Sequence, residues 1–339
     1  MARTLNEEQL LPLLRTLADG GWHSGETLAQ EAGITRAGLS KRLQKLMRWG
    51  LEIETQPGRG CHLVHPLELL DADLIRGALP PGLQGRLALR VLAGTDSTNT
   101  QLLGSDAADD PQALLAEHQS AGRGRHGRSW HSPFGTNLYL SLGWTFAQWP
   151  PALTALPLAT GVATAEALAE LNLADLRLKW PNDLWIGEAP RAPQARVPAK
   201  LGGILIEQRG ESGGACRVVI GLGLNVAMRS ATTAHIGQPW TTLAEALGAT
   251  PSRNALAARI LAHWIAMLER FTLEAFAPFE PRWRALDLLR NRAVTLQLPE
   301  GEVAGIARGV DESGALLVDA GDTRRRILSG DVSLRVTPQ

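Results

Sequence analysis

The chain has 339 residues, with 34 basic and 34 acidic side chains and a formal net charge of +0 at pH 7. This length exceeds what one ordinary hydrophobic core holds, so it predicts two or three domains. Because the whole molecule carries no net charge, a site for an anion or a nucleic acid must come from a local cluster of basic residues.

Cysteine usage and the N-terminal sequence restrict the compartment. Cys61 and Cys216 lie far apart, with no second Cys near either of them, which argues against a disulfide framework and a resident metal site. The stretch MARTLNEEQLLPLL carries acidic residues where a signal peptide needs basic ones, and no apolar run is long enough to span a membrane. We expect a soluble cytoplasmic protein without a membrane partner.

Residues 1–66 are predicted to form a winged helix-turn-helix domain. Thr4 and Glu7 have the spacing of a capping box before a stripe of leucines. The segments GETLAQEAG and RAGLSKRLQKLMRWG follow as two further helices, with Gly33 in the turn between them. The segment LEIETQPGRGCHLV then alternates apolar and polar residues on both sides of a turn, which indicates a hairpin, or wing.

The third predicted helix, within residues 35–49, is rich in basic side chains and contains no acidic one. Such a helix suits the phosphates that border the major groove of DNA. A helical interaction module whose basic face is only solvated is the alternative. The residues predicted to bind DNA are Arg36, Ser40, Lys41, Arg42 and Lys45.

The fold class expected for the whole chain is α+β. Residues 67–285 are predicted to form a domain with a mixed sheet, since strand patterns such as NLYLSLGWTF and GGILIEQ alternate with helices, and a long helical stretch begins at NALAARIL. Residues 286–339 contain short strands separated by turns, which favours a small closed SH3-like β-barrel. The segment 187–199, rich in Pro, Ala and Arg, is predicted to be an extended surface loop.

The segment AGRGRHGRSW, residues 121–130, is a candidate anion site. Its glycines let the backbone approach a ligand, and its arginines offer forked donors that match carboxylate and phosphate oxygens. It is not a P-loop, because no Gly-Lys-Ser/Thr follows, and it precedes a strand instead of opening a helix, unlike a dinucleotide fingerprint. A disordered arginine-glycine tract that binds nucleic acid is the alternative, which the apolar flanks disfavour.

Three further segments also fit ordinary structural roles when each is taken alone. KWPNDLWI places Lys179 before a Pro-Asn turn and Asp183 after it, as a hairpin with a buried tryptophan would. AKLGGILIE places Lys200 at the mouth of a buried strand, where a lone lysine is usually solvated. GLGLNV ends a strand with small residues and Asn225, which permits either a flat ligand or close strand packing.

The joint occurrence of these segments is more specific. With TDSTN, QSAGRGRHGRSW, KWPNDL, KLGGILIE and GLGLNV in this order between a winged helix and a small barrel, the chain resembles the bifunctional biotin protein ligases and biotin operon repressors over nearly its whole length. The resemblance implies that biotin and ATP, with Mg²⁺, give biotinyl-5′-adenylate. The adenylate then acylates one lysine of the biotin carboxyl carrier protein of acetyl-CoA carboxylase.

The resemblance also implies operator DNA of biotin genes as a partner, and a homodimer when the adenylate is bound. Three alternatives are a ligase whose winged helix no longer represses, a ligand-sensing regulator without catalysis, and a lipoate ligase-like enzyme. The intact lysine and arginines argue against the regulator, and GRGRHGR argues for biotin over lipoate.

By motif, the resemblance assigns three sets of site residues. The catalytic set is Lys200, Arg125 and Asp183. The set expected to contact biotin is Ser97, Thr98, Asn99, Gln119, Arg123, Gly124, Arg125, Lys200 and Gly203. The set expected to contact the nucleotide is Arg128, Trp130, Lys179, Asn182, Asn225 and Trp240. His126 stands where the family pattern has another arginine, and it receives no role.

Overall fold

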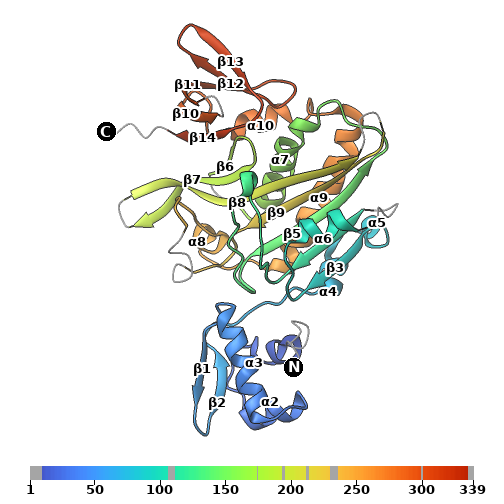
Figure 1. The fold of residues 1–339 in the computed structure, drawn as a ribbon, viewed down its shortest axis with the longest axis vertical. Helices are drawn as coiled ribbons and strands as arrows, with labels where there is room; N and C mark the ends of the chain where they lie inside the picture. The colour runs from blue at the N-terminus through green and yellow to red at the C-terminus, as the bar shows by residue number, and fades with distance from the viewer. Residues whose placement is uncertain are drawn as a thin grey trace.

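The computed structural model describes residues 10–105, 111–173, 175–192, 195–210, 214–229, 236–298 and 301–334. A small helical unit lies at the N-terminal end of the molecule, a large unit built around one sheet lies in the middle, and an all-β unit lies at the opposite end (Figure 1). This arrangement confirms the α+β fold class predicted from the sequence.

The N-terminal unit is a winged helix-turn-helix. Its elements are α1 (Leu11–Leu17), α2 (Gly25–Glu31), α3 (Arg36–Arg48) and the hairpin β1 (Ile53–Gln56) and β2 (Gly60–Leu63). The Thr35 hydroxyl accepts the Gly38 amide at 3.1 Å and so caps α3, and Gly33 takes the left-handed conformation (φ +61°) that the preceding turn requires. The capping box predicted at Thr4 and Glu7 lies outside the described residues.

The central unit is built on a seven-stranded mixed sheet in the order β3-β4-β5-β9-β8-β7-β6. Only the β3–β4 pair among these described strands is parallel. The strands are β3 (Ala88–Leu92), β4 (Gln112–Ala116), β5 (Leu138–Phe146), β6 (Leu176–Lys179), β7 (Asp183–Ala192), β8 (Ala195–Gly210) and β9 (Cys216–Leu224).

Side-chain alternation along β5 separates the two faces of this sheet. Leu140 and Leu142 join the main apolar core with the helices α7 (Leu156–Ala169) and α9 (Arg253–Glu274). Ser141 points to the other face, where its hydroxyl lies 2.6 Å from Asn99 on α6 (Thr98–Gly104). The smaller helical elements are α4 (Ala72–Ala78), α5 (Pro81–Gln84), η2 (Arg125–Gly127), η3 (Leu153–Ala155), α8 (Leu243–Leu247) and α10 (Glu280–Leu286).

Two predictions for the central unit need correction. The long helical stretch is interrupted, because Ala275 adopts φ +53° and separates α9 from α10. The segment 187–199 is not an extended loop: β7 and β8 pair through it as far as Ala192 and Ala195. Register shifts on both sides of Pro190 show how a paired strand accommodates that proline. No helix in the described part of the chain is both long and apolar enough to cross a membrane.

The C-terminal unit is a five-stranded antiparallel sheet in the order β13-β12-β11-β10-β14. Its edge strands β13 and β14 do not pair with each other within the described residues, so the predicted closed barrel is a curled sheet with two edges here. The strands are β10 (Ala293–Leu298), β11 (Gly301–Val310), β12 (Leu316–Ala320), β13 (Thr323–Ile327) and β14 (Asp331–Leu334).

A turn of the C-terminal unit anchors it to the central unit. The indole N–H of Trp180 donates to the Gly314 carbonyl at 2.9 Å, and the Thr154 hydroxyl donates to the Ser313 carbonyl at 2.7 Å. Gly314 has φ +81°, and a Cβ there would lie 2.8 Å from the Ala155 backbone. Only glycine therefore fits this contact.

Candidate active site

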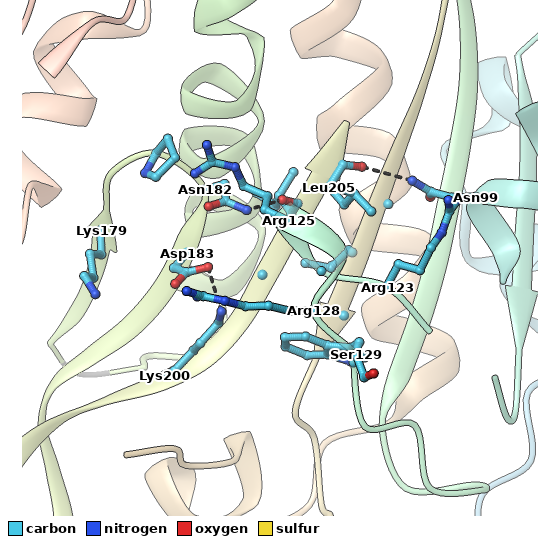
Figure 2. Close-up of a pocket in the computed structure, with 18 of the residues that line it drawn as sticks. Asn99, Arg123, Arg125, Arg128, Ser129, Lys179, Asn182, Asp183, Lys200 and Leu205 are labelled. Atoms are coloured by element: carbon cyan, nitrogen blue, oxygen red, sulfur yellow. Dashed lines mark hydrogen bonds and ion pairs between the residues drawn. The ribbon is translucent and has the colours of Figure 1, made fainter. Parts of the chain in front are cut away.

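A cavity lies where the loop of residues 122–130 crosses the sheet beside β8 and β9 (Figure 2). The structure brings most of the predicted biotin and nucleotide residues together in its wall. The predicted residues that line it are Ser97, Thr98, Asn99, Gln119, Arg123, Gly124, Arg125, Arg128, Trp130, Lys179, Asn182, Asp183, Lys200 and Gly203.

The other two predicted nucleotide residues, Asn225 and Trp240, line a second cavity that adjoins the first. Trp130 and Lys200 belong to the walls of both. The segment that carries Trp240 is held beside Lys200, since the Lys200 amide donates to Pro239 and the Thr241 amide donates to Lys200, each at 3.0 Å. The predicted site is therefore one continuous surface with two compartments.

Trp130 closes the loop against the sheet and separates the two compartments. The loop is a tight hairpin, in which the Trp130 amide donates to the Gly122 carbonyl at 2.8 Å and the Gly124 amide to the Arg128 carbonyl at 2.7 Å. The Trp130 ring lies on β9, where a Cβ added to Gly223 would be 2.3 Å from the indole. Glycine is thus needed at 223 because of a side chain in the opposite wall.

The indole nitrogen of Trp130 is buried and has no hydrogen-bond partner among the described residues. Leaving a buried donor unsatisfied costs about 1–3 kcal/mol. Lys200 Nζ lies 5.4 Å from the centroid of the same ring, within the range of a cation–π contact.

Positive charge dominates the first compartment. Its only acidic wall residue among the described part of the chain is Asp183, whereas the basic wall residues are Arg123, Arg125, Arg128, Lys179 and Lys200. Lys200 Nζ lies 2.8 Å from an Asp183 oxygen, and the two side chains are only 14% and 18% exposed. Because low exposure weakens solvent screening, this wall strongly favours an anion.

The turn between β6 and β7 fixes the acidic residue and its neighbour. Asp183 begins β7 opposite Lys179, as the KWPNDLWI pattern predicts. Asn182 donates its side-chain amide to the Ile204 carbonyl at 2.5 Å and accepts the Ile204 amide at 2.9 Å on its own carbonyl. Lys179 lies at the left of the view in Figure 2, and its Nζ is 4.8 Å from the centroid of the Trp185 ring.

A second, uncharged part of the wall surrounds the start of α6. The Thr98 amide donates to the Gln119 side-chain oxygen at 2.9 Å, and the Ser141 hydroxyl lies 2.7 Å from the Thr98 hydroxyl. Ser97 caps the helix, although its contact with the Thr100 amide is long at 3.4 Å. This cluster of hydroxyls and amides can form hydrogen bonds with a neutral polar ligand group.

Asp96 shapes the turn that carries this cluster. Hydrogen bonds from the Gln101 side chain (3.0 Å) and the Ser97 amide (2.7 Å) lower the pKa of the Asp96 carboxyl below its usual value, although burial works in the opposite direction. The Thr95 hydroxyl donates to the same oxygen at 2.9 Å. The carboxylate therefore holds the TDSTN turn in place from outside the cavity.

Three residues outside the predicted catalytic and binding sets contribute to the site. Ser141 supports Thr98 and Asn99, Trp180 lines the cavity, and Glu207 lies behind Arg123. Two of these had a signal in the sequence. Ser141 interrupts the apolar strand pattern NLYLSL. The two-residue period of a strand places Glu207 on the same face of the strand as Gly203.

The predicted DNA-binding residues follow the surface of α3. Arg36, Ser40 and Lys41 are exposed, whereas Arg42 and Lys45 are half-buried. Arg36 pairs with Glu26 at 3.1 Å, and both side chains are more than three-quarters exposed. Exposed pairs of this kind contribute about 0–1 kcal/mol, so Arg36 can leave Glu26 for a phosphate at little cost.

Comparison with known proteins gives matches along nearly the whole chain. Residues 91–225 match the biotin/lipoate A/B protein ligase family, residues 291–335 match the biotin protein ligase C terminal domain, and residues 7–62 match an HTH domain. The chain is 43% identical over 328 residues to the bifunctional ligase/repressor BirA of Salmonella typhimurium, across 96% of this chain and 97% of that protein.

Two further similarities concern the ligase portion. The biotin–[acetyl-CoA-carboxylase] ligase of Mycobacterium tuberculosis is 35% identical over 271 residues, which cover 78% of this chain and 95% of that protein. The biotin protein ligase from Aquifex aeolicus, solved in complex with biotin and ATP, superimposes with a TM-score of 0.60 at 31% identity. The superposition covers 74% of this chain and 99% of the Aquifex aeolicus chain.

Proposed function

Because this chain belongs to the biotin protein ligase family, we propose that it joins biotin to a protein lysine at the expense of ATP. The observation that carries this proposal is the mostly buried Lys200–Asp183 pair inside a wall whose other charged residues, in the described part of the chain, are all basic. An anionic reaction with a proton acceptor nearby is the chemistry that such a wall serves best.

In the first step a carboxylate oxygen of biotin attacks the α-phosphorus of ATP. The bond from that phosphorus to the bridging oxygen breaks, and pyrophosphate leaves with the electron pair. Two anions approach each other in this step, so fixed positive charge lowers the barrier. We assign that role to Lys200 and Arg125, with Arg128 toward the phosphates, because all three line the same compartment.

The uncharged cluster at the start of α6 is where we place the ring system of biotin. Ser97, Thr98 and Gln119 offer hydroxyl and amide groups to the ureido group, and Gly203 leaves room on β8. Asn99 also lines this part of the cavity. It is 4% exposed and its amide is already bonded inside the protein, so we propose that it braces the cluster.

The second compartment is where we place the adenosine part of the intermediate. Trp240 supplies an aromatic face and Asn225 lies beside it. The Asn225 amide donates to the Thr241 carbonyl at 3.1 Å and so also fixes the segment that carries Trp240. Trp130, which lines both compartments, would then lie along the adenylate.

Magnesium fits this site only as a companion of the nucleotide. No group of three or more His, Cys, Asp or Glu side chains able to hold a metal occurs among the described residues. Magnesium needs only one or two protein carboxylates when phosphates supply its other ligands. Asp183 is the wall residue that would contact it, and the ion would neutralise charge on the phosphates.

In the second step the lysine amine of the acceptor attacks the carbonyl carbon of the adenylate. The bond from that carbon to the phosphate oxygen breaks, AMP leaves, and the amine gives up a proton. Asp183 is the acidic group of the wall and lies 2.8 Å from Lys200, so we assign it the role of orienting this amine and accepting its proton. The acceptor we propose is the biotin carboxyl carrier protein of acetyl-CoA carboxylase.

A transfer assay tests this function. The purified protein is incubated with biotin, ATP, Mg²⁺ and an apo carrier domain, and the mass of the carrier is measured. We expect the mass of one biotin to be added at a single lysine. Lipoate in place of biotin is the matched control. Transfer of lipoate but not biotin would assign the enzyme to the lipoate branch, and no transfer of either would refute the proposal.

DNA binding is a second function that α3 supports. Its exposed face carries Arg36, Ser40 and Lys41, and the β1–β2 wing adds Arg59, which stacks on Trp22 at 4.2 Å. We propose that this unit represses biotin genes from an operator. A two-fold operator requires two winged helices at a fixed spacing, so we also propose that the adenylate-bound protein is a homodimer.

A further inference from the structure

Glu207 is a half-buried carboxylate that takes no part in the proposed reaction. It ends the KLGGILIE motif on β8, and its side chain is 22% exposed. One oxygen, Oε2, accepts from the Asn99 side-chain amide at 2.9 Å and from Arg123 Nη2 at 2.9 Å. Asn99 and Arg123 line the first compartment, whereas Glu207 lies behind them. The carboxylate thus joins two wall residues from outside the cavity.

The arginine is held on one side of its guanidinium. Its Nη2 also donates to the Thr100 hydroxyl at 2.9 Å, and its backbone pairs with Ser129 across the loop. Figure 2 shows the Arg123 side chain extending from the loop toward Asn99. Because both of these side-chain contacts use Nη2, the Nε and Nη1 donors of the fork stay available for an anion in the cavity. Arg123 can therefore keep Glu207 and bind a ligand at the same time.

The asparagine fixes the carboxylate. Asn99 is 4% exposed, its oxygen lies 2.6 Å from the Ser141 hydroxyl, and its amide also reaches the Leu205 carbonyl at 3.2 Å. A Cβ on Gly221 would lie 2.2 Å from the Asn99 oxygen, so this side chain has no room to move toward β9. Glu207 is consequently held by a rigid partner and presents its charge to a loop rich in glycine.

We propose that Glu207 is a positioning residue that fixes Arg123, and through it the glycine–arginine loop, over the biotinyl adenylate. This inference rests on the proposed function. Without the carboxylate, Arg123 and its loop have more conformations to lose when they close over the intermediate, and a charge-assisted hydrogen bond is missing. The adenylate then leaves faster, while the steps that use Lys200 and Asp183 continue.

The test measures how long the intermediate stays bound. Protein loaded with labelled biotin and ATP is chased with unlabelled biotin, and the loss of labelled adenylate is followed by rapid filtration. We expect Glu207→Gln, which can still accept from Asn99, to release the adenylate about fivefold faster. The rate of adenylate formation should change by less than about twofold, since the chemical groups are intact.

A matched control and a second variant keep the test decisive. Glu269→Gln makes the same change in another pair, Arg86–Glu269 at 3.0 Å, and should leave release unaltered. Thr100→Val removes the other partner of Arg123 without touching Asn99, and it should accelerate release by a smaller factor. Wild-type release in a folded Glu207→Gln protein would overturn the inference. If Glu207→Gln does not fold, Thr100→Val decides alone.

A double-mutant cycle separates Arg123 from Asn99 as the route of the effect. In an Arg123→Gln background, Glu207→Gln should cause no further acceleration, because the residue it positions is gone. An undiminished effect in that background would mean that Glu207 acts through Asn99, which contradicts the inference. If wild-type protein forms no biotinyl adenylate, the proposed function itself fails. Adenylate formation with unchanged release refutes only the role of Glu207.

Discussion

Lys200 and Asp183 define the chemistry of the site at the scale of single residues. Their ion pair, at 2.8 Å and mostly buried, balances the lysine charge while no substrate is present. When the substrates bind, the biotin carboxylate and the ATP phosphates neutralise the lysine charge in place of Asp183. The same pair can therefore stabilise the first step through the lysine and serve the second step through the carboxylate.

Asp287 shows a different use of a buried carboxylate. It is 9% exposed, one oxygen accepts the Leu289 amide at 2.8 Å, and the other has no partner among the described residues. Burial raises the pKa of this carboxyl from 3.8 to about 6. The native state thus binds more protons than the unfolded state between these two values, so stability falls as pH rises through this window.

We predict that Asp287→Asn stabilises the protein at pH 8 and has a much smaller effect at pH 4, close to the unfolded-state pKa of 3.8. The neutral amide keeps an acceptor for Leu289 and removes a buried charge, which is worth about 1–3 kcal/mol for a shift of this size. Thermal unfolding of both proteins at the two pH values measures it. An equal difference in stability between wild type and Asp287→Asn at pH 4 and pH 8 would contradict the assignment of the charge to this site.

Short elements determine where these residues meet. The turn between β6 and β7 carries Lys179 to Asp183, and the Trp180 indole ties it to Gly314 of the C-terminal unit at 2.9 Å. The same tryptophan is 2% exposed and lines the first compartment. A domain beyond the main sheet therefore fixes part of the proposed catalytic turn.

Trp180→Phe should loosen this turn. The change keeps an aromatic ring but removes the donor to Gly314, which costs about 1–2 kcal/mol and lowers the melting temperature by about 2–6 °C. We also expect the KM for ATP to rise severalfold. Trp185→Phe is the matched control, since that indole N–H is buried without a partner among the described residues. Equal effects of both variants would argue against the anchoring role of Trp180.

The prediction for DNA binding concerns the helix α3. Replacing Arg36 and Lys41 with alanine removes two exposed charges without opening the core. Operator affinity should fall by more than about tenfold, and the dependence of log K on log salt should decrease in slope by about two, one for each lost phosphate contact. A gel-shift titration measures both quantities. The control is Arg76→Ala, which removes one member of an exposed ion pair outside this domain. An unchanged slope would exclude α3 as the recognition helix.

Periodicity and turn chemistry were sufficient to predict most elements but not their joint geometry. The winged helix, the strand after KWPND and the glycine–arginine loop followed from local patterns. The paired strands within 187–199 could not be predicted in this way. Proline normally argues against a paired strand, and here register shifts let the strands pair around it. The bracing role of Asn99 also could not be predicted, since it depends on Ser141 and Glu207, which are distant in sequence.

The whole molecule joins three units at one site. Arg48 and Trp49, at the end of α3, line the second compartment, and Gly330 and Val332 of the C-terminal unit line the first. Trp49 stacks on Phe134 of the central unit with ring centroids 4.8 Å apart and an interplanar angle of 8°. The winged helix and the proposed nucleotide compartment are therefore in direct physical contact, which gives ligand and DNA binding a route to influence each other.

The central claim, that the basic compartment activates biotin by adenylation, is tested most directly by isotope exchange. Labelled pyrophosphate is added with ATP, Mg²⁺ and the protein, without any acceptor, and its incorporation into ATP is measured. We predict exchange that requires biotin and that falls at least about a hundredfold in a folded Lys200→Met variant. Exchange that proceeds equally without biotin, or near-normal exchange in Lys200→Met, would contradict the account.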